Sequence, residues 1–292
     1  MDEVADPILL AWNLDAREHY ESLVKPAANF IMQRGPTTVQ ERWEEIGGYV
    51  PHSIAAQVAG LIAAADMAEK VGDGASAKAW RAQADEWAGQ IEKWAFTTTG
   101  PLAGGSYFLR TTPDGQPDAV SEITIANGGG KHRVQDVVDV SALELVRLGV
   151  RPAGAASILA TLPAIDASLQ TTSTLGTAWH RYTFDAYGES ASGPLKCPNG
   201  KGHLWPLFAG EHGNYYVAAG KLDSARARLS ALRRFANPGL MLSEQVWEDS
   251  GLGTGSATPR AWTHAEYILL ERSIQAGKVL DMPSVVAGRY AR

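Results

Sequence analysis

The sequence predicts an all-α protein in which helical hairpins form an (α/α) barrel or toroid with long functional loops and little strand. Two observations lead to this fold class. Apolar residues recur at helical spacing in one segment after another, and long connections rich in glycine and proline separate these segments. With 292 residues and 45% hydrophobic content, the chain is long enough to bury a large core.

The clearest predicted helix begins at Pro51 and ends near Gly72. Its apolar residues share one helical face: Ile54, Val58, Leu61, Ile62 and Ala65. A second helix is predicted from a single stripe made of Trp80, Ala84, Trp87, Ile91 and Trp94. The turn Gly72-Asp73-Gly74 joins the two segments, so together they predict an αα-hairpin.

The same pattern recurs further along the chain. Apolar spacing predicts helices from Val137 to Val146, after Pro152 through Leu162, from Tyr215 to Ala219, from Leu222 to Leu232, and from Ala265 to Arg272. With two helices before Gly35, about nine are expected. Strands are expected only at Tyr107 to Arg110 and at Ile123 to Ile125.

Four long connections separate the predicted helices, at residues 34–51, 97–132, 171–204 and 238–260. Loops longer than about 12 to 15 residues are uncommon in compact domains unless they are functional. We therefore expect these loops to build a pocket over the mouth of the helical barrel.

Charge and hydropathy exclude several classes of partner. The net charge is -6 and the basic residues are scattered, which argues against nucleic acid or an anionic membrane surface as a partner. No apolar run approaches the roughly 20 residues of a membrane span. The start Met1-Asp2-Glu3 lacks the basic residues of a signal peptide, and the localisation stays open.

Metal and cofactor sites have little support in the sequence. Cys197 is the only cysteine, which excludes an intramolecular disulfide and a thiolate zinc cluster. The seven histidines show no HExxH or comparable ligand spacing. We expect neither a metal ion nor an organic cofactor.

Loop carboxylates beside tryptophan are the best candidates for chemistry. Hydrolysis of a glycosidic bond with inversion needs two carboxyl groups about 6.5 to 9.5 Å apart, one as acid and one as base. Glu44 and Glu45 follow Trp43, and Glu244 precedes Trp247 by three residues. The alternative is that these glutamates only begin helices, where the helix dipole favours acidic residues.

Four ordered sequence blocks lie between Pro7 and Leu270. The first is Gln40-Glu41-Arg42-Trp43-Glu44-Glu45 followed by Gly47-Gly48-Tyr49, and the second is ITIANGGG at residues 123–130. The third runs from Trp205-Pro206-Leu207 to Gly210-Glu211, and the last is Ser243-Glu244-Gln245-Val246-Trp247, followed by residues 253–259. Together these blocks resemble the bacterial branch of glycoside hydrolase family 15, which contains glucoamylases and glucodextranases.

The resemblance implies an (α/α)6 barrel enzyme that removes glucose from the non-reducing ends of α-glucans or maltooligosaccharides and releases β-glucose. Glu44 is then the general acid and Glu244 the general base. The implied substrate-binding residues are Trp43, Glu45, Arg181, Tyr182, Asp185, Trp205, Glu211 and Trp247. Two alternatives stay open: Trp205 beside Pro206 is a core anchor, and Asp185 only orients Arg181.

The sequence departs from the family at its front. The family barrel has twelve helices and usually follows a β-rich domain, so we expect residues 1–292 to be one catalytic domain without the first barrel helices or that β domain. A Trp-x-Arg-Asp type segment that grips glucose is also missing from this chain. An incomplete barrel would have an open apolar edge, through which copies could self-associate.

Three alternatives to a glucoamylase remain from the sequence. The pocket rim decides linkage preference, so glucodextranase activity on α-1,6 bonds or trehalase activity is possible. The third alternative is a truncated helical protein that binds sugar or a partner chain without turnover. Related enzymes are often exported, although this chain shows no export signal.

Overall fold

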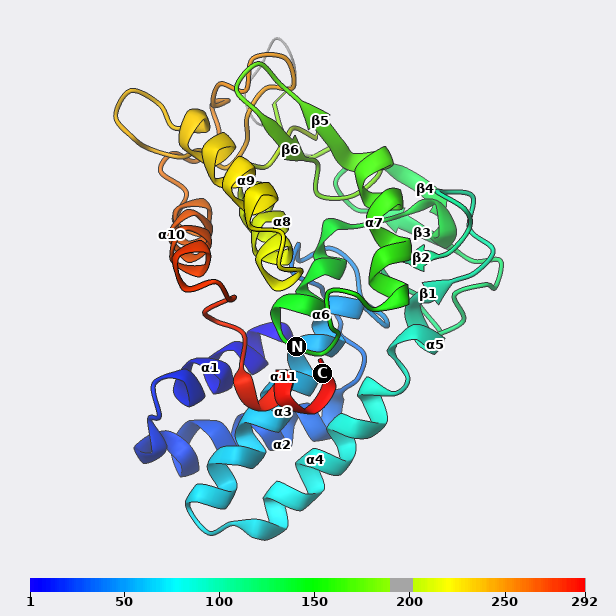
Figure 1. Ribbon diagram of the computed structural model, residues 1–292. Coiled ribbons are helices and arrows are strands. Elements are labelled where there is room, and N and C mark those ends of the chain that lie inside the picture. The colour runs from blue at the N-terminus through cyan, green and yellow to red at the C-terminus, as the bar shows by residue number, and fades with distance from the viewer. Residues whose placement is uncertain (190–201, 292) are drawn as a thin grey trace.

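The computed structural model describes residues 1–189 and 202–291, and it confirms a mostly helical chain built from antiparallel helical neighbours (Figure 1). The helices are α1 (Asp2–Asn13), α2 (Lys25–Arg34), α3 (Pro51–Lys70), α4 (Gly74–Ala88), α5 (Ile91–Ala95), α6 (Glu144–Arg147), α7 (Ala156–Leu169), α8 (Leu207–Ala218), α9 (Leu222–Phe235), α10 (Ala261–Ala276) and α11 (Ser284–Tyr290). Short 3-10 or π turns occur at Arg17–His19, Tyr20–Val24, Val134–Asp136 and Val140–Leu143.

Helix α3 is the centre of the N-terminal half. Almost all of its residues are buried, because α1, α2, α4, α6 and α11 all pack against it. A helix that is apolar on every side needs such a complete cover. Pro51 occupies its first turn, where the missing N–H costs nothing. The predicted helix after Pro51 is therefore confirmed, and it ends at Lys70, just before Gly72.

The second helix of the predicted hairpin is divided in two. Asp73 begins α4 as its N-cap, accepting a hydrogen bond from the backbone N–H of Ser76, and the helix ends at Ala88. Nη2 of Arg151 donates a 2.6 Å hydrogen bond to the carbonyl oxygen of Ala88, and the chain turns before α5 begins. The prediction of one continuous helix from Trp80 to Trp94 is therefore wrong at its C-terminal end, because α4 and α5 are separate helices.

The predicted helix from Val137 to Val146 is wrong over its first half. The carbonyl oxygen of Val137 accepts from the backbone N–H of Arg110, and that of Val138 accepts from Thr183. These bonds to distant loops keep the segment extended. Helical geometry begins only at Val140, with a 3-10 turn that leads into the short helix α6.

The later helices are confirmed with shifted bounds. Helix α8 is longer than the predicted segment 215–219, since it begins at Leu207. Helices α7, α9 and α10 contain the predicted apolar segments. Helix α11, which packs against α3, was not predicted.

Strands form three small antiparallel hairpins: β1 (Phe96–Thr97) with β2 (Tyr107–Phe108), β3 (Glu122–Ile125) with β4 (Gly130–Arg133), and β5 (Gln170–Thr172) with β6 (Thr177–Trp179). The two expected strand segments correspond to β2 and β3, and the other four strands were missed. Each missed strand is two to four residues long, too short for an alternating pattern to stand out.

The long connections are joined to each other by isolated backbone bridges. These bridges pair Tyr49 with Thr112, Asp139 with Tyr182, Trp179 with Trp205, and Leu204 with Val246. Loops that are far apart in the sequence are thereby fixed side by side. Cys197, the cysteine of this chain, lies outside the described residues.

None of the helices in the described ranges combines the length and the apolar run that crossing a bilayer requires.

The close contact between α8 and α10 generates a stability prediction. A Cβ atom added at Gly210 would lie 2.6 Å from the Cβ of Glu266, so Gly210→Ala must push the two helices apart. We expect a loss of about 1 to 3 kcal/mol in the free energy of unfolding. Gly74→Ala is the matched control, because an added Cβ there has no neighbour within 4 Å. Equal effects of the two substitutions in urea unfolding would contradict this packing.

Candidate active site

A cavity of about 400 Å³ lies where the long connections meet. Six of the ten predicted site residues line it: Trp43, Glu44, Glu45, Arg181, Trp205 and Glu244. The remainder of the lining is Arg42, Ala126, Asn127, Tyr187, Arg260 and Trp262. Three carboxylates, three arginines and three tryptophans thus converge on one space, which is the composition of a polar site with apolar walls.

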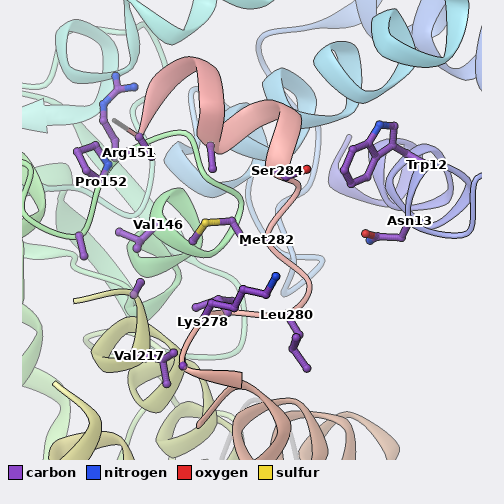
Figure 2. Close-up of a pocket in the computed structure, with 16 residues that line it drawn as sticks. Trp12, Asn13, Val146, Arg151, Pro152, Val217, Lys278, Leu280, Met282 and Ser284 are labelled. Carbon is purple, nitrogen blue, oxygen red and sulfur yellow. The ribbon is translucent and has the colours of Figure 1, made fainter. Parts of the chain in front are cut away.

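A larger cavity, of about 580 Å³, lies beside α11 and the segment that follows α10 (Figure 2). Trp12, Arg151, Lys278 and Met282 are among the residues that line it. Its lining, as far as the described residues extend, contains no carboxylate. Size alone therefore does not identify the reactive site, and acid and base chemistry points to the smaller cavity.

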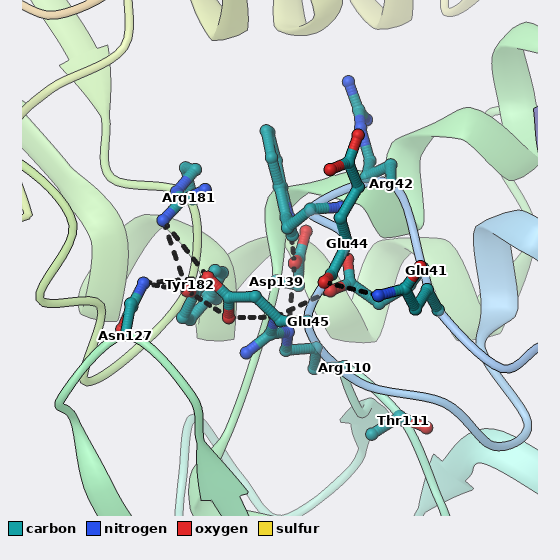
Figure 3. Close-up of polar contacts among 12 residues, drawn as sticks. Glu41, Arg42, Glu44, Glu45, Arg110, Thr111, Asn127, Asp139, Arg181 and Tyr182 are labelled. Carbon is teal, nitrogen blue, oxygen red and sulfur yellow. Dashed lines mark hydrogen bonds and ion pairs between the residues drawn. The ribbon is translucent and has the colours of Figure 1, made fainter. Parts of the chain in front are cut away.

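A tight turn presents the two adjacent glutamates differently. Glu44 has a positive φ of 60°, and its backbone N–H donates to the carbonyl oxygen of Glu41 at 2.7 Å. This left-handed conformation is uncommon for a residue with a side chain, and such residues cluster at functional sites. The two side chains consequently point apart, with Glu44 exposed and Glu45 directed toward Asn127 and Tyr182 (Figure 3).

Glu45 is held by donors on several sides. Its carboxylate accepts hydrogen bonds from Arg110 at 2.8 Å, from Asn127 at 2.8 Å and from the Tyr182 hydroxyl at 2.6 Å (Figure 3). Burial, together with the nearby negative charge of Asp185, raises the pKa of Tyr182 well above its usual range, so its hydroxyl stays a donor. These donors hold the Glu45 carboxylate in a fixed position.

Arg181 is fixed by a bidentate ion pair and by aromatic rings. Asp185 accepts from its Nε at 2.7 Å and from its Nη2 at 2.8 Å. The guanidinium carbon lies 4.9 Å from the Trp43 ring centroid, 4.7 Å from that of Tyr187 and 5.2 Å from that of Trp205. Such a cation over ring faces is electrostatically favourable and leaves little freedom of movement.

Glu244 is mostly buried, and it reaches the cavity from the loop before α10. Its carboxylate forms an ion pair with Arg260 at 3.2 Å and accepts from the Tyr187 hydroxyl at 3.3 Å. The backbone N–H of Glu244 donates to the carbonyl oxygen of Ala257 at 3.0 Å, which fixes this loop. Arg260 and Tyr187 thus fix the position of the Glu244 carboxylate, and a base for water must be positioned in this way.

Tryptophan rings form the apolar wall. Trp43 packs edge-on against Trp205, with ring centroids 5.5 Å apart, and against Trp262 at 5.7 Å. The Trp43 indole N–H donates to Asp139 at 2.8 Å, so its ring is fixed. Trp205 is only 2% exposed yet lines the cavity, so the structure supports both proposed uses of this residue, as wall and as core anchor.

Four predicted substrate-binding residues do not line this cavity. Tyr182 and Asp185 lie behind Glu45 and Arg181 and hold them, which favours the alternative in which Asp185 only orients Arg181. Glu211 is buried in α8, where it pairs with Arg42 at 2.6 Å. The ring of Trp247 packs against that of His203 instead of facing the cavity.

Sequence reasoning missed five polar or aromatic residues of the lining: Arg42, Asn127, Tyr187, Arg260 and Trp262. Arg42 and Asn127 lie inside the first and second sequence blocks, so the sequence already pointed to their segments. Tyr187 and Arg260 contact Glu244, and Trp262 contacts Trp43, only because folding brings separate loops together. Within the described ranges, no group of three or more His, Cys, Asp or Glu side chains is arranged to hold a metal ion.

Residues 1–271 match the family model described as Glycosyl hydrolases family 15. The chain is 48% identical over 290 residues to a glucoamylase from Clostridium sp. (strain G0005), and the match covers 99% of this chain and 41% of that protein. It therefore spans less than half of the length of this curated relative.

Solved structures show the same relation. A bacterial glucoamylase solved in complex with acarbose is 48% identical and superposes with a TM-score of 0.98, over 100% of this chain and 43% of that one. A glucoamylase from Saccharomycopsis fibuligera, at 15% identity, has a TM-score of 0.61 over 89% of this chain and 62% of its own. At that identity, the likeness concerns the fold alone.

The ion pairs of Arg110 generate the prediction for this site. Its side chain, 1% exposed, bonds to Glu41 and Glu45 at 2.8 Å each, so Arg110→Met leaves Glu41 without its cation and leaves Glu45 only Arg181 at 3.5 Å. We expect a loss of about 3 to 5 kcal/mol in the free energy of unfolding. Arg226→Met breaks an exposed ion pair with Asp223 and should change the free energy of unfolding by less than about 1 kcal/mol. Similar losses in both variants on urea unfolding would refute this role for Arg110.

Proposed function

This chain belongs to glycosyl hydrolase family 15, and we propose that it removes glucose from the non-reducing ends of α-glucans and releases it as the β-anomer. The observation that carries the proposal is one cavity lined by both Glu44 and Glu244, with tryptophan walls. An inverting glycosidase needs such a pair of carboxyl groups, one to protonate the leaving oxygen and one to activate water. The 48% identity to glucoamylases supports an α-glucan as the substrate.

The surroundings of the three carboxylates support different roles. Glu44 is exposed and is assigned as the general acid that protonates the glycosidic oxygen. Glu244, paired with Arg260, is assigned as the base that takes a proton from water. Glu45 already accepts from several fixed donors, which suits an acceptor for sugar hydroxyls better than an acid.

The rings and Arg181 support a sugar as the occupant. Trp43 and Trp205 line the cavity with apolar ring atoms that can contact the C–H face of a glucose ring. Arg181 provides N–H donors in a fixed orientation among these rings. Preorganised donors of this kind cost little to align when the substrate binds. We assign residues 1–292 to one catalytic unit, since the family model covers residues 1–271.

The test of this function is glucose release from maltotetraose by the chain and by its Glu44→Gln and Glu244→Gln variants. Each substitution should lower kcat by about 100-fold to 10,000-fold, because it removes one proton-transfer step. Glu271→Gln, on the exposed side of α10, is the control and should keep the wild-type rate. Equal activity in all four proteins would contradict the assignment, and so would a folded wild-type chain that binds acarbose without releasing glucose.

Linkage preference is tested with the same proteins. We expect faster glucose release from maltotetraose than from isomaltotriose or trehalose, because the two relatives at 48% identity are glucoamylases. A preference for isomaltotriose would favour a glucodextranase, and a preference for trehalose would favour a trehalase.

We also propose that copies of the chain associate through exposed apolar residues of α1, its C-cap Leu14 and α10. Leu10, Leu14 and Ile268 are 59%, 70% and 59% exposed, which is high for large apolar side chains. Light scattering during size-exclusion chromatography should show a concentration-dependent dimer that the double variant Leu10→Gln, Leu14→Gln weakens. A wild-type monomer at every concentration would contradict this proposal.

A further inference from the structure

Two buried glutamates face the gap between α8 and α10, behind the candidate active site. Glu211 of α8 and Glu266 of α10 are each 3% exposed, and neither lines the cavity. Their helices pack closely, as the contact between Gly210 and Glu266 shows. Two carboxylates in such a dry place cannot both stay ionised without matching cations.

Glu211 has its own cation: burial raises the pKa of Glu211, and the ion pair with Arg42 opposes that rise. Its Oε1 accepts from the Nη2 of Arg42 at 2.6 Å, while Nη1 of Arg42 donates to Ser141 at 3.2 Å. The same guanidinium lies 4.9 Å from the ring centroid of Trp43 and 4.5 Å from that of Trp262. Arg42 directly precedes Trp43 and Glu44 in the chain, so this contact anchors the loop that carries the candidate acid.

Two buried acceptors on α8 lack donors. Within the described part of the chain, Glu211 Oε2 and Asn214 Oδ1 are buried and accept no hydrogen bond. Asn214 donates its own N–H to Glu266 at 3.4 Å, and Glu211 lies three residues before Asn214 on the same face of α8. Buried acceptors normally have a donor, and a proton on Glu266 would supply one.

The acidic charges near Glu266 also favour its neutral form. Glu211 on α8, Glu144 on α6 and Asp281 after α10 each raise its pKa, whereas Arg147 on α6 lowers it. Arg147 already pairs with Glu144 at 2.7 Å and with Asp281 at 2.6 Å, while Arg233 of α9 pairs with Glu271 on the exposed side of α10. Burial, with the help of the other three acids, raises the pKa of Glu266 to about 8.

We propose that Glu266 keeps a proton at neutral pH and donates it to an acceptor on α8, which leaves the one negative charge on Glu211 to position Arg42 and the Glu44 loop. Glu211 and Glu266 are therefore positioning residues. Their effect on catalysis rests on the function proposed above, whereas the proton itself does not.

The proton is tested without any activity assay. A folded-state pKa near 8, against an ordinary value near 4.5, means that the folded chain binds the extra proton between these pH values. The wild-type melting temperature should therefore fall relative to Glu266→Gln as the pH rises from about 4.5 to 8, and the difference should level off above that. The infrared band of a protonated carboxyl at pH 7 should be lost in Glu266→Gln. A pH-independent difference together with an unchanged band would overturn the proposal.

The positioning role is tested by applying the same chemical change to both acids. Glu266→Gln keeps a donor and a neutral side chain, whereas Glu211→Gln removes the charge that holds Arg42. At pH 7, we expect Glu211→Gln to lower kcat/KM for maltotetraose at least about tenfold more than Glu266→Gln does. Glu271→Gln serves as the surface control on the same helix. Equal losses in the two buried variants would show a purely structural role and would overturn the positioning claim.

If the wild-type chain releases no glucose, the proposed function fails, and acarbose affinity replaces kcat/KM as the readout of the Arg42 position. Acarbose affinity should then fall at least about tenfold more in Glu211→Gln than in Glu266→Gln. Equal affinities of these two variants would overturn the positioning claim. The melting and infrared measurements remain valid in either case, so the two failures are distinguishable.

Discussion

Buried arginine–carboxylate pairs fix the short loop that carries Trp43, Glu44 and Glu45, and the arrangement of the pocket depends on them. Arg110 holds Glu41 and Glu45 from one side, and Arg42 ties the same loop to Glu211 on α8. Charges that are buried and hydrogen-bonded in this way are costly to separate, so the loop has one strongly preferred position. The turn at Glu44 then leaves the Glu44 side chain exposed and directs that of Glu45 toward Asn127 and Tyr182.

The helical scaffold matters to the site mainly because it brings distant loops together. Helix α3 is covered on all sides and gives the N-terminal half a rigid centre, while α8 and α10 carry the acids behind the pocket. Backbone bridges such as Asp139 with Tyr182 and Leu204 with Val246 then connect one loop to the next. The pocket is thus assembled from residues 42–262, and no single segment contains it.

Local patterns predicted the parts of this structure that depend on local chemistry. The spacing of apolar residues was sufficient to predict α3 and α9, because each helix buries a continuous apolar face. The same reasoning failed at Val137, where backbone bonds to Arg110 outweigh helical spacing. The sequence blocks located Glu44 and Glu244, but they could not show whether the side chains of neighbouring residues face the cavity. Trp247 accordingly packs on His203, and Tyr187, Arg260 and Trp262 enter the pocket without a local signal.

We propose that Glu44 and Glu244 act on one bound sugar as acid and base, with water attacking directly. Proton NMR of the glucose first released from maltotetraose tests this most directly, because the anomer is recorded before mutarotation. We expect β-glucose as the initial product. Initial α-glucose would require a covalent or otherwise retaining mechanism, and it would contradict the roles assigned to these two carboxylates.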